Sequence, residues 1–149
     1  MLFTQFFATV TILMLGVVYG TDVFFAVVGR SALAHVSEAS LTEVMGRLHE
    51  VADRRMPFFG VLAIIGTIGL VAIVPGPYSI LALGAQLTHL GIYFLVSKPV
   101  NVILTAAANQ GESLTDAPQL QRRWDSVIVP RALLLGLALM CIALIRLHA

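Results

Sequence analysis

Long uncharged, apolar stretches alternate with short polar segments along this chain. No charged residue occurs in 2–21 or in 56–97, and Arg131 is the single charge in 126–145. Pro75-Gly76-Pro77-Tyr78 divides the second stretch, because proline and glycine favour turns. A helix needs about 20 apolar residues to cross the hydrocarbon core of a bilayer, so the pattern predicts four membrane-spanning helices. We place them at about residues 2–28, 56–74, 78–97 and 126–147.

The first polar connection carries signals for the end of one helix and the start of the next. Gly29-Arg30-Ser31 combines a flexible residue, a charge and a capping residue, which predicts the end of the first helix. Ser40-Leu41-Thr42-Glu43 matches the S-x-x-E capping box, so the second helix is expected to begin there, outside the membrane. We expect this helix to enter the membrane near Met56 and to be kinked or interrupted at Pro57.

The second connection also carries helical sequence. The third helix is expected to pass Lys98 and to continue toward Asn109, and Asp116 followed by Pro118 predicts the start of the fourth helix ahead of the membrane. The predicted fold class is therefore all-α. We expect an integral membrane four-helix bundle with cytoplasmic helix extensions, in a single domain that covers residues 1–149.

Composition excludes several classes of protein. Of the 149 residues, 58% are hydrophobic and 11% are charged, against about a quarter charged in soluble domains. One cysteine, no basic block and no polar low-complexity tract argue against a disulfide scaffold, a nucleic-acid binder and a disordered chain. The expected partners are membrane lipid and an apolar small molecule. A second copy of the chain is a further candidate, because Gly16-Val17-Val18-Tyr19-Gly20 is a G-x-x-x-G motif, which serves close helix packing within a bundle or between copies.

The basic residues predict the orientation of the helices. All but Arg146 lie on or near the two connections, namely Arg30, Arg47, Arg54, Arg55, Lys98, Arg122, Arg123 and Arg131. The positive-inside rule then places both connections in the cytoplasm and both termini outside, most simply in a bacterial inner membrane. The first apolar stretch lacks a basic segment before it and is too long for a signal peptide, so we expect it to be retained.

Several polar residues inside the apolar stretches fall at one depth. Counted inward from the cytoplasmic boundary, Asp22, Tyr93 and Arg131 lie about four to six residues deep, and His89 lies one turn deeper on the stripe of Tyr93. Ionisable residues within a bilayer usually face a bundle interior or a cavity. The alternative is a buried Asp22–Arg131 pair that only locks the helices, with His89 as an interhelical hydrogen-bond donor.

Further polar residues lie within two turns outside the same boundary: His49, Asp53, Lys98, Asn101 and Trp124. Together the two groups predict a pocket that opens at the cytoplasmic interface. Trp124 alone would be typical of an aromatic residue at a membrane interface. His49 and Asp53 also stand four residues apart on one helix face, a spacing that permits two ligands to one metal ion. No third ligand is identifiable, and a solvated helix face is the favoured explanation of this pair, although metal content stays open.

Two short motifs connect the chain to a known family. Pro99-Val100-Asn101 with Leu104 gives P-x-N-x-x-L, Leu120 and Trp124 give L-x-x-x-W, and Arg131 follows the tryptophan by seven residues. With four spans in this order, the chain resembles the small four-helix membrane proteins of the anthrone oxygenase family, in particular its bacterial branch. One position departs from the pattern: many relatives carry Asn or His four residues after the tryptophan, and this chain has Ile128.

The resemblance implies a membrane oxidoreductase that oxidises an apolar aromatic or quinone-like substrate, with dioxygen as co-substrate and no other cofactor defined. Arg131 would stabilise an enolate or peroxide, Asn101 would bind the carbonyl and Trp124 would stack on the rings. The catalytic candidates are Arg131, Asn101, His49 and His89, the last two as base. The substrate-binding candidates are Trp124, Tyr93, Asp22 and Lys98.

Two alternatives remain open. Within the oxidoreductases, the substrate could be a quinone or another isoprenoid with a bound metal. Outside them, the chain could be a non-enzymatic membrane subunit or a carrier of small molecules or protons, because a polar pocket with Asp and Arg also suits a proton-coupled carrier.

Overall fold

The computed structural model describes residues 2–148, which are helical apart from short connections and contain no strand. The elements in chain order are α1 (Leu2–Phe24), the π-helical turn η1 (Phe25–Gly29), α2 (Arg30–Leu33), α3 (Glu38–Ile73), α4 (Pro77–Ile92), the π-helical turn η2 (Tyr93–Ser97), α5 (Lys98–Gln110) and α6 (Ala117–His148). The all-α prediction is confirmed for this part of the chain. The described residues form four helices long and apolar enough to cross a membrane: 2–33, 38–73, 77–110 and 117–147.

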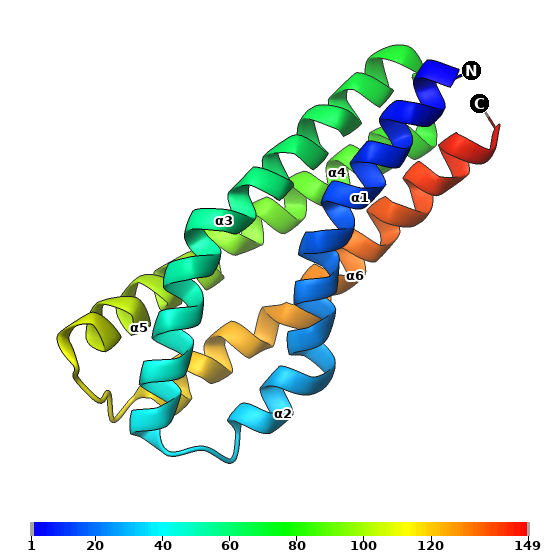
Figure 1. Ribbon diagram of the computed structural model, residues 1–149. Helices are drawn as coiled ribbons and strands as arrows, with labels where there is room; N and C mark the ends of the chain where they lie inside the picture. The colour runs from blue at the N-terminus through cyan, green and yellow to red at the C-terminus, as the bar shows by residue number, and fades with distance from the viewer. Residues whose placement is uncertain (1, 149) are drawn as a thin grey trace.

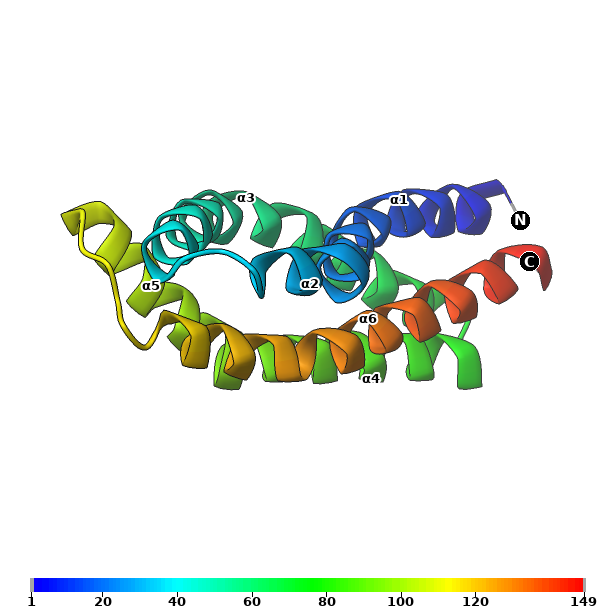
Figure 2. The same ribbon diagram turned by 90° about the horizontal axis from the view of Figure 1, so that it is seen from below.

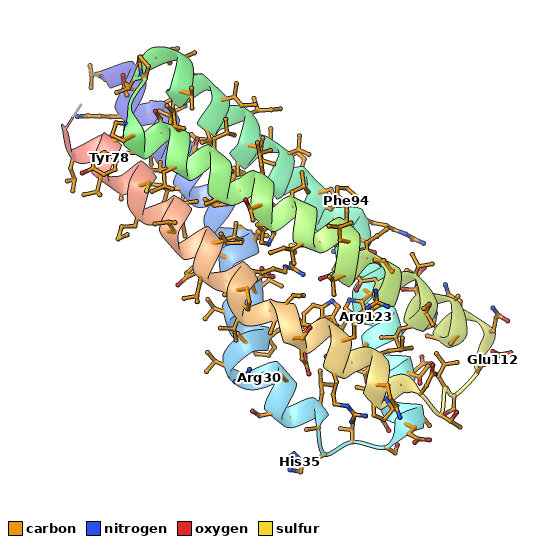
Figure 3. All side chains as sticks on the ribbon, turned by 180° about the vertical axis from the view of Figure 1, so that it is seen from behind. Arg30, His35, Tyr78, Phe94, Glu112 and Arg123 are labelled. Carbon is orange, nitrogen blue, oxygen red and sulfur yellow. The ribbon has the colours of Figure 1, made fainter. Side chains whose placement is uncertain are left out.

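The four long helices form an antiparallel bundle of two layers. Both chain ends lie at one end of the bundle, and the α2–α3 and α5–α6 connections lie at the other (Figure 1). Viewed from below, α1 and α3 form one layer, and α4 and α6 form the second (Figure 2). Tyr78 marks the end that holds the termini, while His35 and Glu112 mark the opposite end (Figure 3).

The predicted end of the first helix at Gly29-Arg30-Ser31 is wrong. The helix continues through η1 and α2 to Leu33, with Gly29 buried inside it. A Cβ atom at Gly29 would collide with the ring of Phe25, one π turn earlier. The glycine therefore makes room for a ring within the helix, where the sequence suggested a stop signal.

The predicted capping box at Ser40-Leu41-Thr42-Glu43 is also wrong. α3 begins at Glu38, and its N-cap is Ser37, whose Oγ accepts a hydrogen bond of 3.2 Å from the backbone N–H of Ser40. Ser37 has the extended backbone that an N-cap residue prefers, so it ends the connection earlier than the box predicted. The helix continues through Pro57 without interruption.

The remaining helix ends agree closely with the sequence. α3 ends at Ile73 and α4 begins at Pro77, on either side of the predicted turn, and α6 begins one residue after Asp116. α5 ends at Gln110 and is capped by Gly111, whose φ of 70° favours glycine. With 36 and 32 residues, α3 and α6 are about 54 and 48 Å long at 1.5 Å per residue. Both exceed the hydrocarbon thickness of about 30 Å, in agreement with helices that extend beyond the spans.

Two glycines of α3 allow close contacts between helices. Gly46 lies against the carbonyl oxygen of Leu104 and the side chain of Ala108 on α5, and Gly66 lies against Thr11 on α1. By contrast, a Cβ atom at Gly16 or Gly20 would meet nothing within 4 Å. The G-x-x-x-G motif therefore takes no part in helix packing inside this bundle.

The close contact at Gly46 gives the first prediction. Gly46→Ala should lower the free energy of unfolding by roughly 1–3 kcal/mol, because the added methyl group has no space between α3 and α5. The matched control is Gly84→Ala on α4, where a Cβ atom meets nothing within 4 Å. Thermal unfolding in detergent measures both, and equal effects of the two substitutions would contradict this packing.

Candidate functional site

A cavity of about 560 Å³ lies among the four long helices. This volume is in the range of small-molecule sites, which combine apolar walls with a few polar groups. Its lining includes eight of the residues singled out from the sequence: Asp22, His49, Asp53, His89, Tyr93, Asn101, Trp124 and Arg131. The expected meeting of Asn101, Trp124, Arg131, Tyr93 and Asp22 at one pocket is therefore observed. Lys98 is not part of the lining.

The Arg131 side chain is held on three sides. Nη2 donates to Asp22 Oδ1 at 2.9 Å, and Nη1 donates to Ser97 Oγ at 2.7 Å. Nε lies 3.3 Å from His89 Nε2. Arg131 is 7% exposed and Asp22 is 3% exposed, so this is a buried ion pair, which the sequence analysis gave as the alternative to a pocket; here the pair also lines the cavity. Its partners come from α1, α4 and η2, which places those elements around α6.

His89 contacts both members of this ion pair through one ring nitrogen. Its Nε2 lies 3.0 Å from Asp22 Oδ2 and 3.3 Å from Arg131 Nε. A protonated Nε2 donates to the carboxylate, whereas an unprotonated Nε2 accepts from the guanidinium. One ring nitrogen satisfies only one of these neighbours at a time, so the position of its proton decides which of the two it supports.

Asp53 accepts hydrogen bonds from a second group of side chains. Oδ1 accepts from the Tyr93 hydroxyl at 2.6 Å and from Asn101 Nδ2 at 3.0 Å, and Oδ2 accepts from Lys98 Nζ at 3.0 Å. The carboxylate of α3 thus binds three side chains of η2 and α5. Among residues 2–148, no three His, Cys, Asp or Glu side chains are grouped closely enough to hold a metal ion.

Aromatic rings surround Trp124 at the connection end of the cavity. Its ring centroid lies 5.2 Å from that of Phe25 and 5.6 Å from that of His49. Arg131 Cζ lies 5.8 Å from the ring centroids of both Trp124 and Tyr93, within the range of cation–π attraction. Ile128 is fully buried in the same apolar cluster as Trp124.

Four buried residues of the lining each have a polar atom without a protein partner in the described structure: His49 Nε2, Gln86 Oε1, Asn101 Oδ1 and Trp124 Nε1. Each of these residues is at most 5% exposed. The carboxylate of Asp53 can only accept, so it takes the NH₂ group of Asn101 and leaves the carbonyl oxygen free. The cavity therefore offers one N–H donor, two carbonyl acceptors and one imidazole nitrogen to a ligand.

The third long helix presents its polar residues at intervals of four. His89, Tyr93, Ser97 and Asn101 all bind groups of the two networks. On an α-helix each such step overshoots one turn by about 40°, so the four would spread over roughly 120° of the surface. The π-helical turn η2, between Tyr93 and Ser97, has more residues per turn and therefore reduces this angular spread. Sequence analysis missed Ser97, and this spacing is the signal that would have found it.

No family model, curated protein or solved structure matches the chain.

The buried ion pair gives a second prediction. Arg131→Leu should lower the free energy of unfolding by about 3–5 kcal/mol, because it leaves the Asp22 carboxylate buried without its cation. Adding Asp22→Asn should recover part of that loss, since the uncompensated charge is then removed. Denaturant unfolding of the two single variants and the double variant measures the coupling. Additive effects would show that the pair contributes nothing beyond its separate members.

Proposed function

We propose that the chain is an integral membrane protein of the bacterial inner membrane, with both connections in the cytoplasm and both termini outside. The support is the length and composition of the four helices and the concentration of Lys and Arg at the connection end. The helix extensions that carry His49, Asn101 and Trp124 then lie at the cytoplasmic interface, and the Asp22–Arg131 pair lies just inside the bilayer.

We further propose that the cavity oxidises an apolar aromatic or quinone-like molecule. The observation that carries this is the buried guanidinium of Arg131, set against the rings of Tyr93 and Trp124 on the wall of a largely apolar cavity. A fixed positive charge in such surroundings stabilises a developing anion far better than it does in water. An aromatic alcohol or ketone that becomes an oxyanion is the kind of substrate that uses this property.

For an anthrone the reaction balances without a further cofactor. A base removes a proton from the carbon opposite the ketone, which leaves an enolate. The enolate gives two electrons to dioxygen and forms a carbon–oxygen bond, and the proton returns to make a hydroperoxide. Loss of water breaks the oxygen–oxygen bond and leaves a quinone, so one oxygen atom enters the product and the other enters water.

The role proposed for each side chain follows from its polar atoms that have no protein partner. His49 is the proposed base, because its Nε2 is unpartnered, whereas Nε2 of His89 is shared between Asp22 and Arg131. Arg131 has five N–H bonds and uses three of them, so two remain for the anion. Trp124 Nε1 would donate to a substrate oxygen. Asn101 presents an acceptor, which suits a hydroxyl group better than the carbonyl suggested by the resemblance.

A proton carrier is the second candidate function. The observation in its favour is the position of His89 Nε2 between a carboxylate and a guanidinium, since its proton state would change the pairing of both. Proton flux into liposomes that contain the purified protein would support this function, and flux equal to that of empty liposomes would remove it.

Topology gives a third prediction. In a Cys141→Ala background, Leu147→Cys should react with a membrane-impermeant maleimide on intact spheroplasts, and Ser113→Cys should react only after permeabilisation. Both positions are exposed, so accessibility depends on the side of the membrane alone. The opposite labelling pattern would reverse the orientation.

Catalysis gives a fourth prediction. The protein in nanodiscs should convert an anthrone to the quinone with consumption of one dioxygen, and His49→Gln should lower kcat by roughly 10²–10⁴-fold, as expected for loss of a general base. The matched control is His35→Gln, because His35 is exposed and bonds only the backbone oxygen of Ser31. Absorbance of the quinone and an oxygen electrode measure the rate. Equal rates for both variants would contradict the role of His49.

A further inference from the structure

The cavity is long in the direction of the helices. On α3 its lining runs from Leu48 to Ile64, and on α6 it runs from Trp124 to Leu135. At 1.5 Å per residue these intervals correspond to about 24 and 17 Å. This length exceeds that of a fused three-ring aromatic, so a compact ring system would occupy only part of the space.

Polarity changes along this length. Three of the four groups available to a ligand, those on His49, Asn101 and Trp124, lie at the connection end. The opposite end is lined largely by apolar side chains, among them Leu15, Val18, Ile64 and Leu135. Gln86 is the polar exception: its amide nitrogen donates to Thr67 Oγ1 at 2.6 Å and to the carbonyl oxygen of Ala82 at 3.3 Å, and its Oε1 has no partner among the described residues.

Part of the lining also faces the outside of the bundle. Val61 on α3 is 53% exposed and Phe94 on η2 is 58% exposed, and both line the cavity. Phe94 lies on the outer side of its helix (Figure 3). Both residues belong to the uncharged stretch 56–97, so the surface that they border faces hydrocarbon in the proposed orientation.

We propose that the ligand is an amphiphile, with a hydroxyl-bearing ring at the His49–Asn101–Trp124 end and a flexible alkyl or isoprenoid tail along the apolar end, where the wall borders the lipid. The inference rests on the proposed function and names its substrate class as a tailed phenol or quinol. The free carbonyl oxygen of Asn101 accepts from a hydroxyl group and repels a ketone oxygen, so the reduced, hydroxyl form is the one bound.

Trp124 makes occupation of the cavity measurable, because it is the only tryptophan of the chain and lies in the lining. The experiment titrates the protein in nanodiscs with three probes: a benzoquinol with a ten-carbon tail, the same benzoquinol without a tail, and a three-ring phenol. Ligand concentrations are expressed per lipid, so that partition into the bilayer does not count as affinity. Quenching of Trp124 fluorescence by the tailed quinol should be half complete at a roughly tenfold lower concentration than by the other two.

Two glycines provide the matched variants. Gly60 lines the cavity and Gly84 does not, and a Cβ atom at either meets nothing within 4 Å. Gly60→Leu should weaken binding of the tailed quinol roughly tenfold and leave the quinol without a tail unchanged. Gly84→Leu should change neither. If Gly60→Leu fails to fold, the comparison of the three probes on the unmodified protein still tests whether the ligand is a tailed amphiphile.

Equal affinity per lipid for the three probes would overturn the inference. This outcome leaves the proposed function standing if the anthrone is still oxidised. Conversely, selective binding of the tailed quinol without any oxidation supports the amphiphile and removes the oxidoreductase, so the two proposals fail separately.

Discussion

A guanidinium group buried among apolar helices requires a partner for its charge and for each direction in which its N–H bonds point. Arg131 meets this requirement with a carboxylate on α1, a hydroxyl group at the end of η2 and an imidazole on α4. Burying a charge without a partner costs several kcal/mol, so the three partners must lie at the same depth in the bundle. The relative heights of α1, α4 and α6 follow from that single side chain.

Asp53 places the same kind of constraint on α3. Its carboxylate is matched by Lys98 and by two neutral donors, so each of the two networks contains one carboxylate and one permanent cation. The two networks meet at η2, which contributes Tyr93 to one and Ser97 to the other. Between them the cavity keeps polar atoms that neither network uses, and these atoms are what a ligand would meet.

Much of this arrangement follows from the sequence, and the exceptions have physical reasons. Charge-free runs mark the four long helices, and counting depth places Asp22 and Arg131 in one layer inside the apolar runs, where a charge is costly without a partner. Asp53 was expected near the mouth of the pocket, but its three hydrogen-bond donors were not, since a polar residue outside the apolar run is equally typical of a solvated face. Ser97 and Ser37 were missed, because a single hydroxyl within or beside an apolar run carries no charge that requires a partner; for Ser97 only its spacing of four from Tyr93 and Asn101 is a signal. The early start of α3 depends on the backbone of Ser37, which a motif search does not see.

The π turn η2 links the chemistry of the cavity to chain length. A π turn holds one residue more than an α-helical turn, so it is what a single inserted residue leaves behind in a helix. Deleting one residue from 93–97 would rotate α5 by about 100° relative to α4. His89 would keep its place beside Arg131, while Asn101 would leave Asp53 and take its carbonyl oxygen out of the cavity. A gain or loss of one codon at this point would therefore alter what the cavity recognises, with almost no change in the hydrophobic length of the helix.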